Sequence, residues 1–238
     1  MNEIPQDTAA LQARIGYTFS DPTLLRLALT HSSYANEMGI REHHLHCNER
    51  LEFLGDSILS VVVSEALYRT YPDKPEGELT RLRSDSVCEN ALAKYAVQIG
   101  LGEYLYLGIG EEKNDGRSRK SLLADAFEAL LAAMWLDAGA KEGLEIVTRF
   151  LLPLATAQWQ EAMAGGRDCK TRLQQFIQQT GNDLLEYTEV GESGPDHCKV
   201  FRVEARLGAN VIGRGSGRSK KEAEQNAAHD ALRLFGVL

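Results

Sequence analysis

The sequence predicts an all-α domain followed by a small α+β domain with the element order α-β-β-β-α. Apolar residues recur at helical spacing throughout the N-terminal part of the chain, whereas clean period-two alternation appears only later, in Val200–Leu207. Between these regions, a polar stretch and the pair Gly165–Gly166 are typical of a linker. We therefore expect one domain over residues 1–157 and a second over residues 168–238, joined by a flexible linker over residues 158–167.

Helical spacing and chain breakers define the elements of the first domain. Breakers are concentrated in Pro72–Gly77, Gly100–Gly102 and Gly108–Gly116. The run Val61–Val63 is β-branched, but it lies within a longer helical pattern. The helices predicted between the breakers are Pro22–Leu29, Glu49–Tyr71, Ser84–Ile99, Ser121–Ala138 and Gly143–Leu152.

The second domain has two predicted helices around three predicted strands. The first helix ends at Gly181, a residue type common after helix C-termini. In the middle strand, Phe201, Val203 and Ala205 alternate with charged residues. The predicted elements are Asp168–Thr180, Leu184–Val190, Val200–Leu207, Asn210–Arg214 and Lys220–Phe235.

The charge of the chain is unevenly distributed. The net charge of −8 suggests weak attraction to nucleic acids, but residues 1–166 hold 15 basic and 24 acidic residues, whereas residues 167–238 hold 11 and 10. An acidic enzyme can still act on RNA if metal ions and a local basic surface neutralise the phosphates. The total charge therefore excludes no substrate class.

Targeting signals and disulfide patterns are absent from the sequence. The N-terminus has no basic start followed by an apolar run, and the most apolar stretch, Leu122–Leu136, contains two acids. The four cysteines show no CxxC spacing, which favours free thiols. We expect a cytoplasmic protein that does not associate with a membrane.

Three acids share one face of the helix that begins after Asn48, a good N-cap residue. At about 100° per residue, Glu49, Glu52 and Asp56 fall within roughly 60° of arc. An acid in the first turn is stabilised by the helix dipole, but Asp56 lies two turns into the helix. The repulsion among these acids therefore indicates a binding partner.

Two further acids, Asp125 and Glu128, interrupt a helix that is otherwise apolar nearly all round. Neither has a lysine or arginine four residues away, and an unpaired buried carboxylate costs several kcal/mol. A divalent cation bound by both groups of acids resolves this conflict. Carboxylate ligands without histidine or cysteine suit Mg²⁺ or Mn²⁺, which can activate water in phosphodiester hydrolysis.

A simpler interpretation of the acids remains open at this stage. Glu49 and Glu52 can be solvated surface residues, while Asp125 and Glu128 can be core residues with satisfied hydrogen bonds. Phe53, which lies among the acids, can be an ordinary core residue.

The last helix begins with an unusual arrangement of charges. Ser219 and Glu222 form a capping box, which places Lys220 and Lys221 in the first turn. Two cations there oppose the helix dipole, at a cost of about 0.3–1 kcal/mol each, unless an anion binds. The start of this helix is therefore a candidate phosphate site, although two solvated lysines explain the pattern as well.

Other motifs give weaker indications. The cluster His43, His44, His46 and Cys47 has no familiar zinc-ligand spacing. The glycines of Gly108–Gly110 and Gly213–Gly215 lack the context of nucleotide-binding loops, so we expect no nucleotide cofactor. The pair His31–Ser32 suggests a local hydrogen bond rather than a hydrolase nucleophile.

Four segments resemble a known enzyme family. Asn48–Ser57 matches the signature of the ribonuclease III family at every position, and Leu123–Leu130 resembles its second acidic motif. Leu29–Asn36 and Glu76–Arg83 also resemble family segments, although Ser32 stands where a basic residue is more usual. The resemblance extends over nearly the whole chain.

The resemblance implies the roles of the acids. Glu52, Asp56, Asp125 and Glu128 would hold the catalytic Mg²⁺ ions, for which Mn²⁺ can substitute. Asp56 and Glu128 would be catalytic, and Glu49 would assist at the cleavage site.

The resemblance also implies contacts outside the metal site. Glu76 would lie near the bound RNA. The enzyme would be a homodimer in which Phe53 enters a cavity of the partner subunit.

The C-terminal unit resembles the double-stranded RNA-binding domain, which recognises A-form shape, phosphates and 2′-hydroxyls over about 16 base pairs. This resemblance implies minor-groove contacts from the first helix and from the loop Gly194–His197, and phosphate contacts from the start of the last helix. The residues implied are Thr171, Gln174, Gln178, His197, Arg218, Lys220 and Lys221.

The expected activity is hydrolysis of double-stranded RNA by metal-activated water. The family resemblance implies 5′-phosphate and 3′-hydroxyl ends with short 3′ overhangs, and substrates among rRNA precursors and structured mRNA, tRNA precursors or small RNA. Two rivals are a non-cutting RNA-binding regulator and a metal-dependent phosphatase with an appended RNA module. Cleavage of an RNA duplex, with and without a chelator, distinguishes them.

Overall fold

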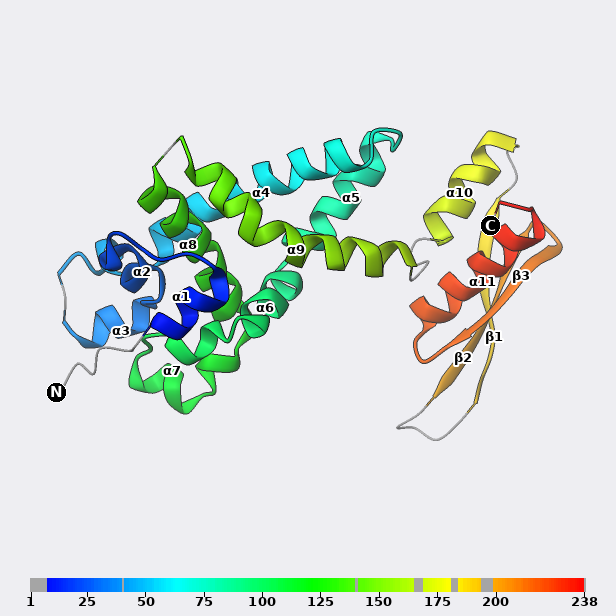
Figure 1. The fold of residues 1–238 in the computed structure, drawn as a ribbon. Helices are drawn as coiled ribbons and strands as arrows, with labels where there is room; N and C mark the ends of the chain where they lie inside the picture. The colour runs from blue at the N-terminus through cyan, green and yellow to red at the C-terminus, as the bar shows by residue number, and fades with distance from the viewer. Residues whose placement is uncertain are drawn as a thin grey trace. The chain divides into compact units, whose positions relative to one another are not determined.

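The computed structural model describes residues 8–39, 41–139, 141–164, 169–180, 184–193 and 199–237. The chain divides into two compact units, Met1–Gln160 and Glu161–Leu238. The first unit is helical and the second combines helices with a sheet (Figure 1), so the predicted fold class is confirmed. Among the described helices, none combines the length and apolar character that crossing a bilayer requires.

The first unit is a group of helices arranged around α8, Lys120–Ala138. This helix packs against α2, α4 and α6, and its residues from Leu122 to Met134 are buried except Asp125 and Glu128. The other elements of the unit are α1 Ala9–Ile15, α2 Pro22–Ala28, α3 Ser32–Glu37, η1 His43–Leu45, α4 Glu49–Thr70, α5 Glu76–Val87, α6 Glu89–Gln98, η2 Leu101–Tyr104, α7 Ile109–Lys113, η3 Gly116–Ser118 and α9 Gly143–Ala164.

Two predicted helices differ from the structure by more than a residue or two. The single helix expected over Ser84–Ile99 is wrong, because Cys88 has extended backbone angles and separates α5 from α6. The expected helix over Gly143–Leu152 is too short, since α9 continues through Pro153 to Ala164. Residues 158–164, which we expected to belong to a linker, are therefore helical.

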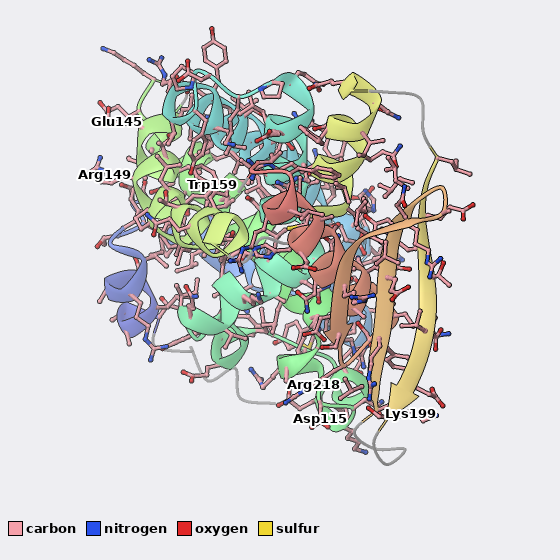
Figure 2. The ribbon with its side chains drawn as sticks, turned by 90° about the vertical axis from the view of Figure 1, so that its right-hand side faces the viewer. Asp115, Glu145, Arg149, Trp159, Lys199 and Arg218 are labelled. Atoms are coloured by element: carbon pink, nitrogen blue, oxygen red, sulfur yellow. The ribbon has the colours of Figure 1, made fainter. Side chains whose placement is uncertain are left out.

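Trp159 explains why α9 extends beyond Pro153. The side chain, which is labelled in Figure 2, is fully buried, and its indole N–H donates to the hydroxyl of Ser86 on α5. Its ring also meets Tyr71, at the end of α4, edge to face with 6.3 Å between centroids. These contacts hold the second half of α9 against the helix that carries Glu76.

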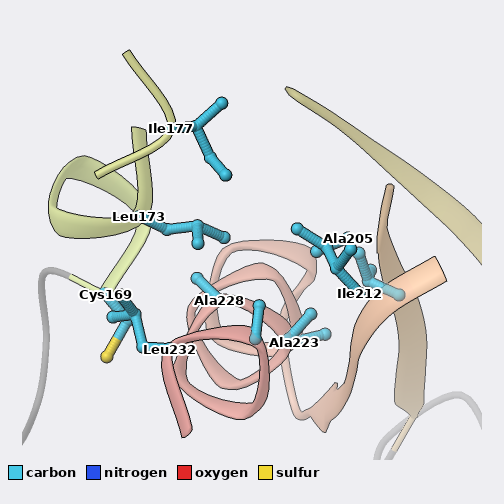
Figure 3. Close-up of a cluster of buried hydrophobic side chains, with 11 residues drawn as sticks. Cys169, Leu173, Ile177, Ala205, Ile212, Ala223, Ala228 and Leu232 are labelled. Carbon is cyan, nitrogen blue, oxygen red and sulfur yellow. The ribbon is translucent and has the colours of Figure 1, made fainter. Parts of the chain in front are cut away.

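The second unit consists of a three-stranded antiparallel sheet with both helices on one face. The strands have the order β1-β2-β3, and their register pairs Leu185 with Leu207 and Phe201 with Gly217. Side chains from both helices and from the inner face of the sheet form its core (Figure 3). The elements are α10 Cys169–Thr180, β1 Leu185–Ser193, β2 Val200–Leu207, β3 Asn210–Gly217 and α11 Lys220–Leu234.

Alternate glycines on β3 allow α11 to approach the strand closely. A Cβ atom on Gly213 would lie 2.2 Å from the carbonyl oxygen of Ala227, and one on Gly215 would lie 2.2 Å from that of Ala223. Because these are backbone atoms, a side chain at either glycine would push the helix away from the strand. The sequence therefore sets the position of α11 through direct backbone contact.

Candidate metal centre and phosphate-binding helix

The two acid-bearing helices, α4 and α8, cross at Gly55. A Cβ atom at this position would lie only 2.0 Å from the carbonyl oxygen of Glu128. Glycine therefore permits the close approach that brings Glu52 and Asp56 beside the acids of α8. A glycine within a helix costs about 1 kcal/mol relative to alanine, so its presence here is consistent with a packing requirement.

The crossing assembles a three-carboxylate cluster from both helices. One carboxylate oxygen from each of Glu52, Asp125 and Glu128 lies within 4.8 Å of the others, and all three side chains are half-buried. Asp56 is exposed and is not part of this group of three, but its charge acts on Glu128. Glu49, also exposed, acts on Glu52 in the same way.

The electrostatics of the cluster are unfavourable in the absence of a cation. Burial raises the pKa of Glu128 to about 8, with further contributions from Asp56, Glu52 and Asp125. Burial likewise raises the pKa of Glu52, with contributions from Asp125 and Glu49. For Asp125, burial also raises the pKa, although the charge of His31 opposes this effect.

The donor set fits a hard divalent cation. The ligands are carboxylate oxygens on two packed helices, and the described ion pairs include none from a lysine or arginine to Glu52, Asp125 or Glu128. Oxygen-only ligation of this kind suits Mg²⁺ or Mn²⁺. A cation would also remove the charge repulsion that raises these pKa values.

The histidine-rich segment forms no comparable site. Among the described residues, no cluster with metal-binding geometry contains His43, His44, His46 or Cys47. Cys47 is buried beside the start of α4, while the three histidines are exposed.

Other predicted residues of the first unit lie on its surface. Glu76 is the exposed first residue of α5 and accepts a hydrogen bond from the hydroxyl of Thr80 at 2.7 Å. Phe53 projects from α4 with 79% of its surface exposed. The alternative interpretation of Phe53 as a core residue of its own subunit is wrong.

The first turn of α11 has the expected cap. The hydroxyl of Ser219 accepts a hydrogen bond from the backbone N–H of Glu222 at 3.2 Å. The carboxylate of Glu222 accepts one from the N–H of Arg218, rather than from Ser219 as in an ideal capping box. Lys221 is exposed, and Arg218 flanks the same end of the sheet as Lys199 (Figure 2).

Lys220 is partly neutralised within its own unit. Its ammonium group lies 2.7 Å from a carboxylate oxygen of Glu189 on β1 and 5.8 Å from the centre of the Phe201 ring. The hydrogen bond to Glu189 raises the pKa of Lys220, and the charge of Glu192 adds to this effect. The side chain remains 64% exposed, so an external anion can reach it.

The polar residues expected on the first helix of the second unit share its solvent face. Thr171, Gln174 and Gln178 on α10 are exposed, whereas Leu173 and Ile177 face the core (Figure 3). The predicted loop residue His197 lies outside the described residues.

Two residues near the cluster were missed by sequence reasoning. Gly55 could have been found as an isolated glycine inside a helical pattern. His31 was assigned only a local hydrogen bond with its neighbour; its ring does bond locally, to Ser33 rather than Ser32. Its interaction with Asp125 depends on tertiary structure, for which the sequence holds no local signal.

Comparison with known proteins agrees with both units. A family model described as Ribonuclease-III-like matches residues 21–154, and one described as Double-stranded RNA binding motif matches residues 169–234. The chain is 49% identical to Ribonuclease 3 of Desulforamulus reducens over 234 residues, covering 98% of this chain and 93% of that protein. It is 48% identical to Ribonuclease 3 of Caldanaerobacter subterraneus subsp. tengcongensis, covering 96% and 98%.

Solved structures resemble the first unit. The nuclease domain of ribonuclease III from Campylobacter jejuni is 36% identical, with a TM-score of 0.56 and coverage of 63% of this chain and 94% of that one. A second structure of that domain has the same identity and TM-score, and its title describes structural flexibility in a region involved in dimer formation.

Proposed function

The chain belongs to the ribonuclease III family, and from this premise we propose that it hydrolyses both strands of double-stranded RNA at the carboxylate cluster of α4 and α8. The observation that carries the proposal is the convergence of Glu52, Asp125 and Glu128 at one half-buried point. The family membership and the double-stranded RNA binding motif supply the substrate class.

The metal centre would be held by Glu52, Asp56, Asp125 and Glu128, with Mg²⁺ as the ion and Mn²⁺ as a substitute. When bound, such an ion supplies an activated water and stabilises the leaving oxygen of the phosphodiester. The chain's own contribution is to hold the carboxylates close together. The crossing at Gly55 brings the two helices together, and the buried surroundings of Glu128 limit competition from bulk water.

Asp56 and Glu49 are the exposed acids of this region. We assign Asp56 and Glu128 as the catalytic carboxylates and Glu49 as a group that assists at the cleavage site. Glu76 is proposed to lie along the bound RNA, since it is exposed at the start of α5.

Duplex binding is assigned to the two helices of the second unit. Thr171, Gln174 and Gln178 form one exposed face of α10 that can contact a minor groove. Lys220, Lys221 and Arg218 are proposed to contact the phosphates of the adjoining major groove, with His197 contributing from the loop that follows β1.

A homodimer would place two such centres on one duplex. The exposed apolar side chains Phe53, Val61 and Tyr68 fall within about 80° of one side of α4, which is a large apolar surface for a solvated helix. We assign Phe53 as the residue that enters the partner subunit. The expected consequence is that each subunit cuts one strand.

Replacing Phe53 tests this assembly. Phe53→Ala should weaken dimerisation by about 2 kcal/mol, or roughly 30-fold in dissociation constant, as expected for a central aromatic anchor. Sedimentation velocity over a concentration series measures this constant. Ile109→Ala, at an exposed apolar residue of α7, is the control. Unchanged dimerisation of the Phe53 variant would exclude the proposed contact.

Each part of the chain has a proposed role. We propose that residues 1–157 act as the catalytic domain, 168–238 as the RNA-binding domain, and 158–167 as the connection, in a cytoplasmic enzyme. The substrates would be rRNA precursors and structured mRNA, tRNA precursors or small RNA. The products would carry 5′-phosphate and 3′-hydroxyl ends with short 3′ overhangs.

A cleavage assay on a long RNA duplex tests the function directly. Cleavage should require Mg²⁺, stop with a chelator, and resume with Mn²⁺, and end-group analysis should find 5′-phosphates. Binding without cleavage would favour the non-cutting regulator instead. Hydrolysis of a small phosphate ester, but not of duplex RNA, would favour the phosphatase.

A further inference from the structure

Lys170, in the first turn of α10, is held between side chains of two other elements. Its ammonium group lies 2.6 Å from a carboxylate oxygen of Glu224 on α11 and 4.4 Å from the centre of the Tyr187 ring on β1. Only 33% of the Lys170 side chain and 30% of the Glu224 side chain are exposed. The pair is therefore an internal contact of the second unit rather than two solvated surface charges.

A hydrogen bond to the backbone connects the same two helices. The side-chain oxygen of Gln225 on α11 accepts it from the N–H of Lys170 at 3.1 Å. The first N–H groups of a helix have no partner within that helix, so this bond also satisfies one such group of α10. Lys170, Glu224 and Gln225 together form what we call the interhelical link.

The apolar contact between α10 and α11 does little to fix their relative position. All buried residues of α11 except Leu232 are alanines, and Leu173 of α10 lies in the same core (Figure 3). Alanine side chains form only shallow ridges, so a neighbouring helix can shift along them at little cost. A hydrogen bond and a charged pair are directional, and the interhelical link therefore restricts the position of α10 along α11 more than the alanines do.

The interhelical link connects the two groups of residues proposed to contact RNA. Lys170 directly precedes Thr171 on α10. Glu224 lies one turn after Lys220 and Lys221 on α11. Thr171 and both lysines of α11 are exposed, whereas Glu224 is half-buried. An A-form duplex presents its minor groove and the adjoining phosphates at a fixed separation, so the distance between the two groups of residues affects binding.

We propose that Glu224 is a positioning residue for duplex binding: by holding Lys170, it keeps the exposed face of α10 at the separation from the first turn of α11 that an A-form duplex requires. The inference rests on the proposed function, because it assumes that both helices contact the RNA. A carboxylate repels phosphates, so Glu224 acts through Lys170 and not through a contact of its own.

Glu224→Met tests this role, because positioning and simple electrostatics predict changes of opposite sign. Methionine favours a helix and has a similar length, but it carries no charge. Electrostatics alone predicts tighter binding, since an acid is removed and Lys170 is freed to approach a phosphate. We expect instead that the affinity of the full chain for a labelled RNA duplex, measured in Ca²⁺ to prevent turnover, falls about 3–5-fold. Unchanged or tighter binding would exclude the positioning role.

Glu186→Met is the matched control. It removes one acid from β1 of the same unit, where Glu186 is exposed and lies opposite Arg206 in the sheet register. Its duplex affinity should stay at the parent value or rise slightly. If it weakens binding as much as Glu224→Met does, the interhelical link is not the cause and the proposal is wrong.

Lys170→Met breaks the same pair from α10. It should weaken binding by a similar factor, and the double variant with Glu224→Met should bind no more weakly than either single variant, because all three lose one contact. Lys170→Arg, which can still pair with Glu224, should bind like the parent. Losses that multiply in the double variant, or a salt dependence reduced by about one phosphate contact in Lys170→Met, would assign Lys170 a contact of its own and refute the proposal.

Gln174→Ala separates this proposal from the assignment of the RNA-binding surface. It removes a proposed contact of α10, so in this background Glu224→Met should weaken binding less than in the parent. An equal loss in both backgrounds would mean a general destabilisation of the unit and contradict a positioning role. Parent-like binding by both Gln174→Ala and Lys221→Ala overturns the assigned surface, and the role of Glu224 with it. Weakened binding by these two variants, with parent-like binding by Glu224→Met, overturns the role of Glu224 alone.

Discussion

The carboxylate cluster and the first turn of α11 both concentrate charge of one sign, but among their described residues only Lys220 of α11 has an ion-pair partner. At the cluster, Glu52, Asp125 and Glu128 approach within 4.8 Å and burial raises their pKa values. At α11, Lys220 is exposed and pairs with Glu189 at 2.7 Å. At α11 the chain therefore supplies a partner of opposite charge, whereas the ion pairs of the described residues include none to the three acids of the cluster.

The difference follows from burial. A half-buried carboxylate interacts strongly with its neighbours because the surrounding dielectric constant is low. An exposed ion pair is worth only about 0–1 kcal/mol. Substitutions in the cluster should consequently change the cleavage rate strongly. Substitutions in the first turn of α11 should change the affinity for duplex RNA by smaller factors.

The largest effect is expected for Glu128→Gln. The substitution removes one proposed ligand, the acid of the cluster whose pKa is raised to about 8, and the remaining carboxylates cannot substitute for it. Cleavage in Mg²⁺ should fall by at least about 1000-fold, corresponding to several kcal/mol of lost metal assistance. Duplex binding, measured in Ca²⁺ to prevent turnover, should persist. Normal cleavage by this variant would refute the catalytic assignment.

The pH dependence of stability should reveal the same repulsion without RNA. Because the pKa of Glu128 rises from 4.5 to about 8 on folding, the unfolded chain releases this proton at lower pH than the folded chain. This group therefore makes the metal-free protein less stable as the pH rises through that window.

Thermal unfolding in chelator checks this second prediction. Between about pH 5 and 8, the Tm of the parent should fall more than that of Glu128→Gln. The difference should be about 2–4 °C for each kcal/mol that ionisation of Glu128 takes from the free energy of unfolding. Mg²⁺ should raise the Tm of the parent at pH 8, since it binds only the folded chain, and should have a smaller effect on the variant. If the Tm of the parent and of Glu128→Gln changed equally with pH, the charge of Glu128 would already be compensated within the chain.

The two lysines of α11 provide a smaller contrast. Lys221→Ala should weaken duplex binding about 10-fold, which is the value of one charge-assisted hydrogen bond of about 1.5 kcal/mol. Lys220→Ala should cost less, because the parent must first break the pair with Glu189. Both should reduce the salt dependence of binding by about one phosphate contact. Equal losses for the two variants would mean that the internal pair has no influence.

The smallest effect is expected for Glu189→Gln. Releasing Lys220 from its internal partner should tighten duplex binding by about 2–3-fold, the range of an exposed ion pair. Glu186→Gln makes the same charge change on β1, opposite Arg206 in the sheet register, and should tighten binding less. If both variants bind alike, the gain comes from net charge and not from the pair.

Local sequence patterns were sufficient for much of the fold. The boundaries of β2 were predicted correctly because Val200–Leu207 alternates cleanly. The break at Cys88 was missed because the apolar spacing continues across it. The extension of α9 was missed because it depends on Trp159 reaching Ser86, a contact between residues far apart in the chain.

The candidate site, like the fold, was predictable from the sequence only where local patterns determine it. Helical periodicity placed Glu49, Glu52 and Asp56 on one face, and the apolar surroundings singled out Asp125 and Glu128. Periodicity cannot bring two helices together, so the role of Gly55 and the position of His31 became visible only in the structure. The pairing of Lys220 with Glu189 likewise requires the sheet to be folded.

The glycines of β3 have a consequence for how duplex affinity can change. At Gly213 and Gly215 the backbone of α11 lies so close to β3 that neither position can take a side chain unless the helix moves. Since α10 packs against α11 in the same core, a shift of α11 would also disturb the position of α10. Substitutions of surface charges should therefore change the affinity for duplex RNA without altering the spacing of strand and helix, whereas a side chain at either glycine should alter that spacing.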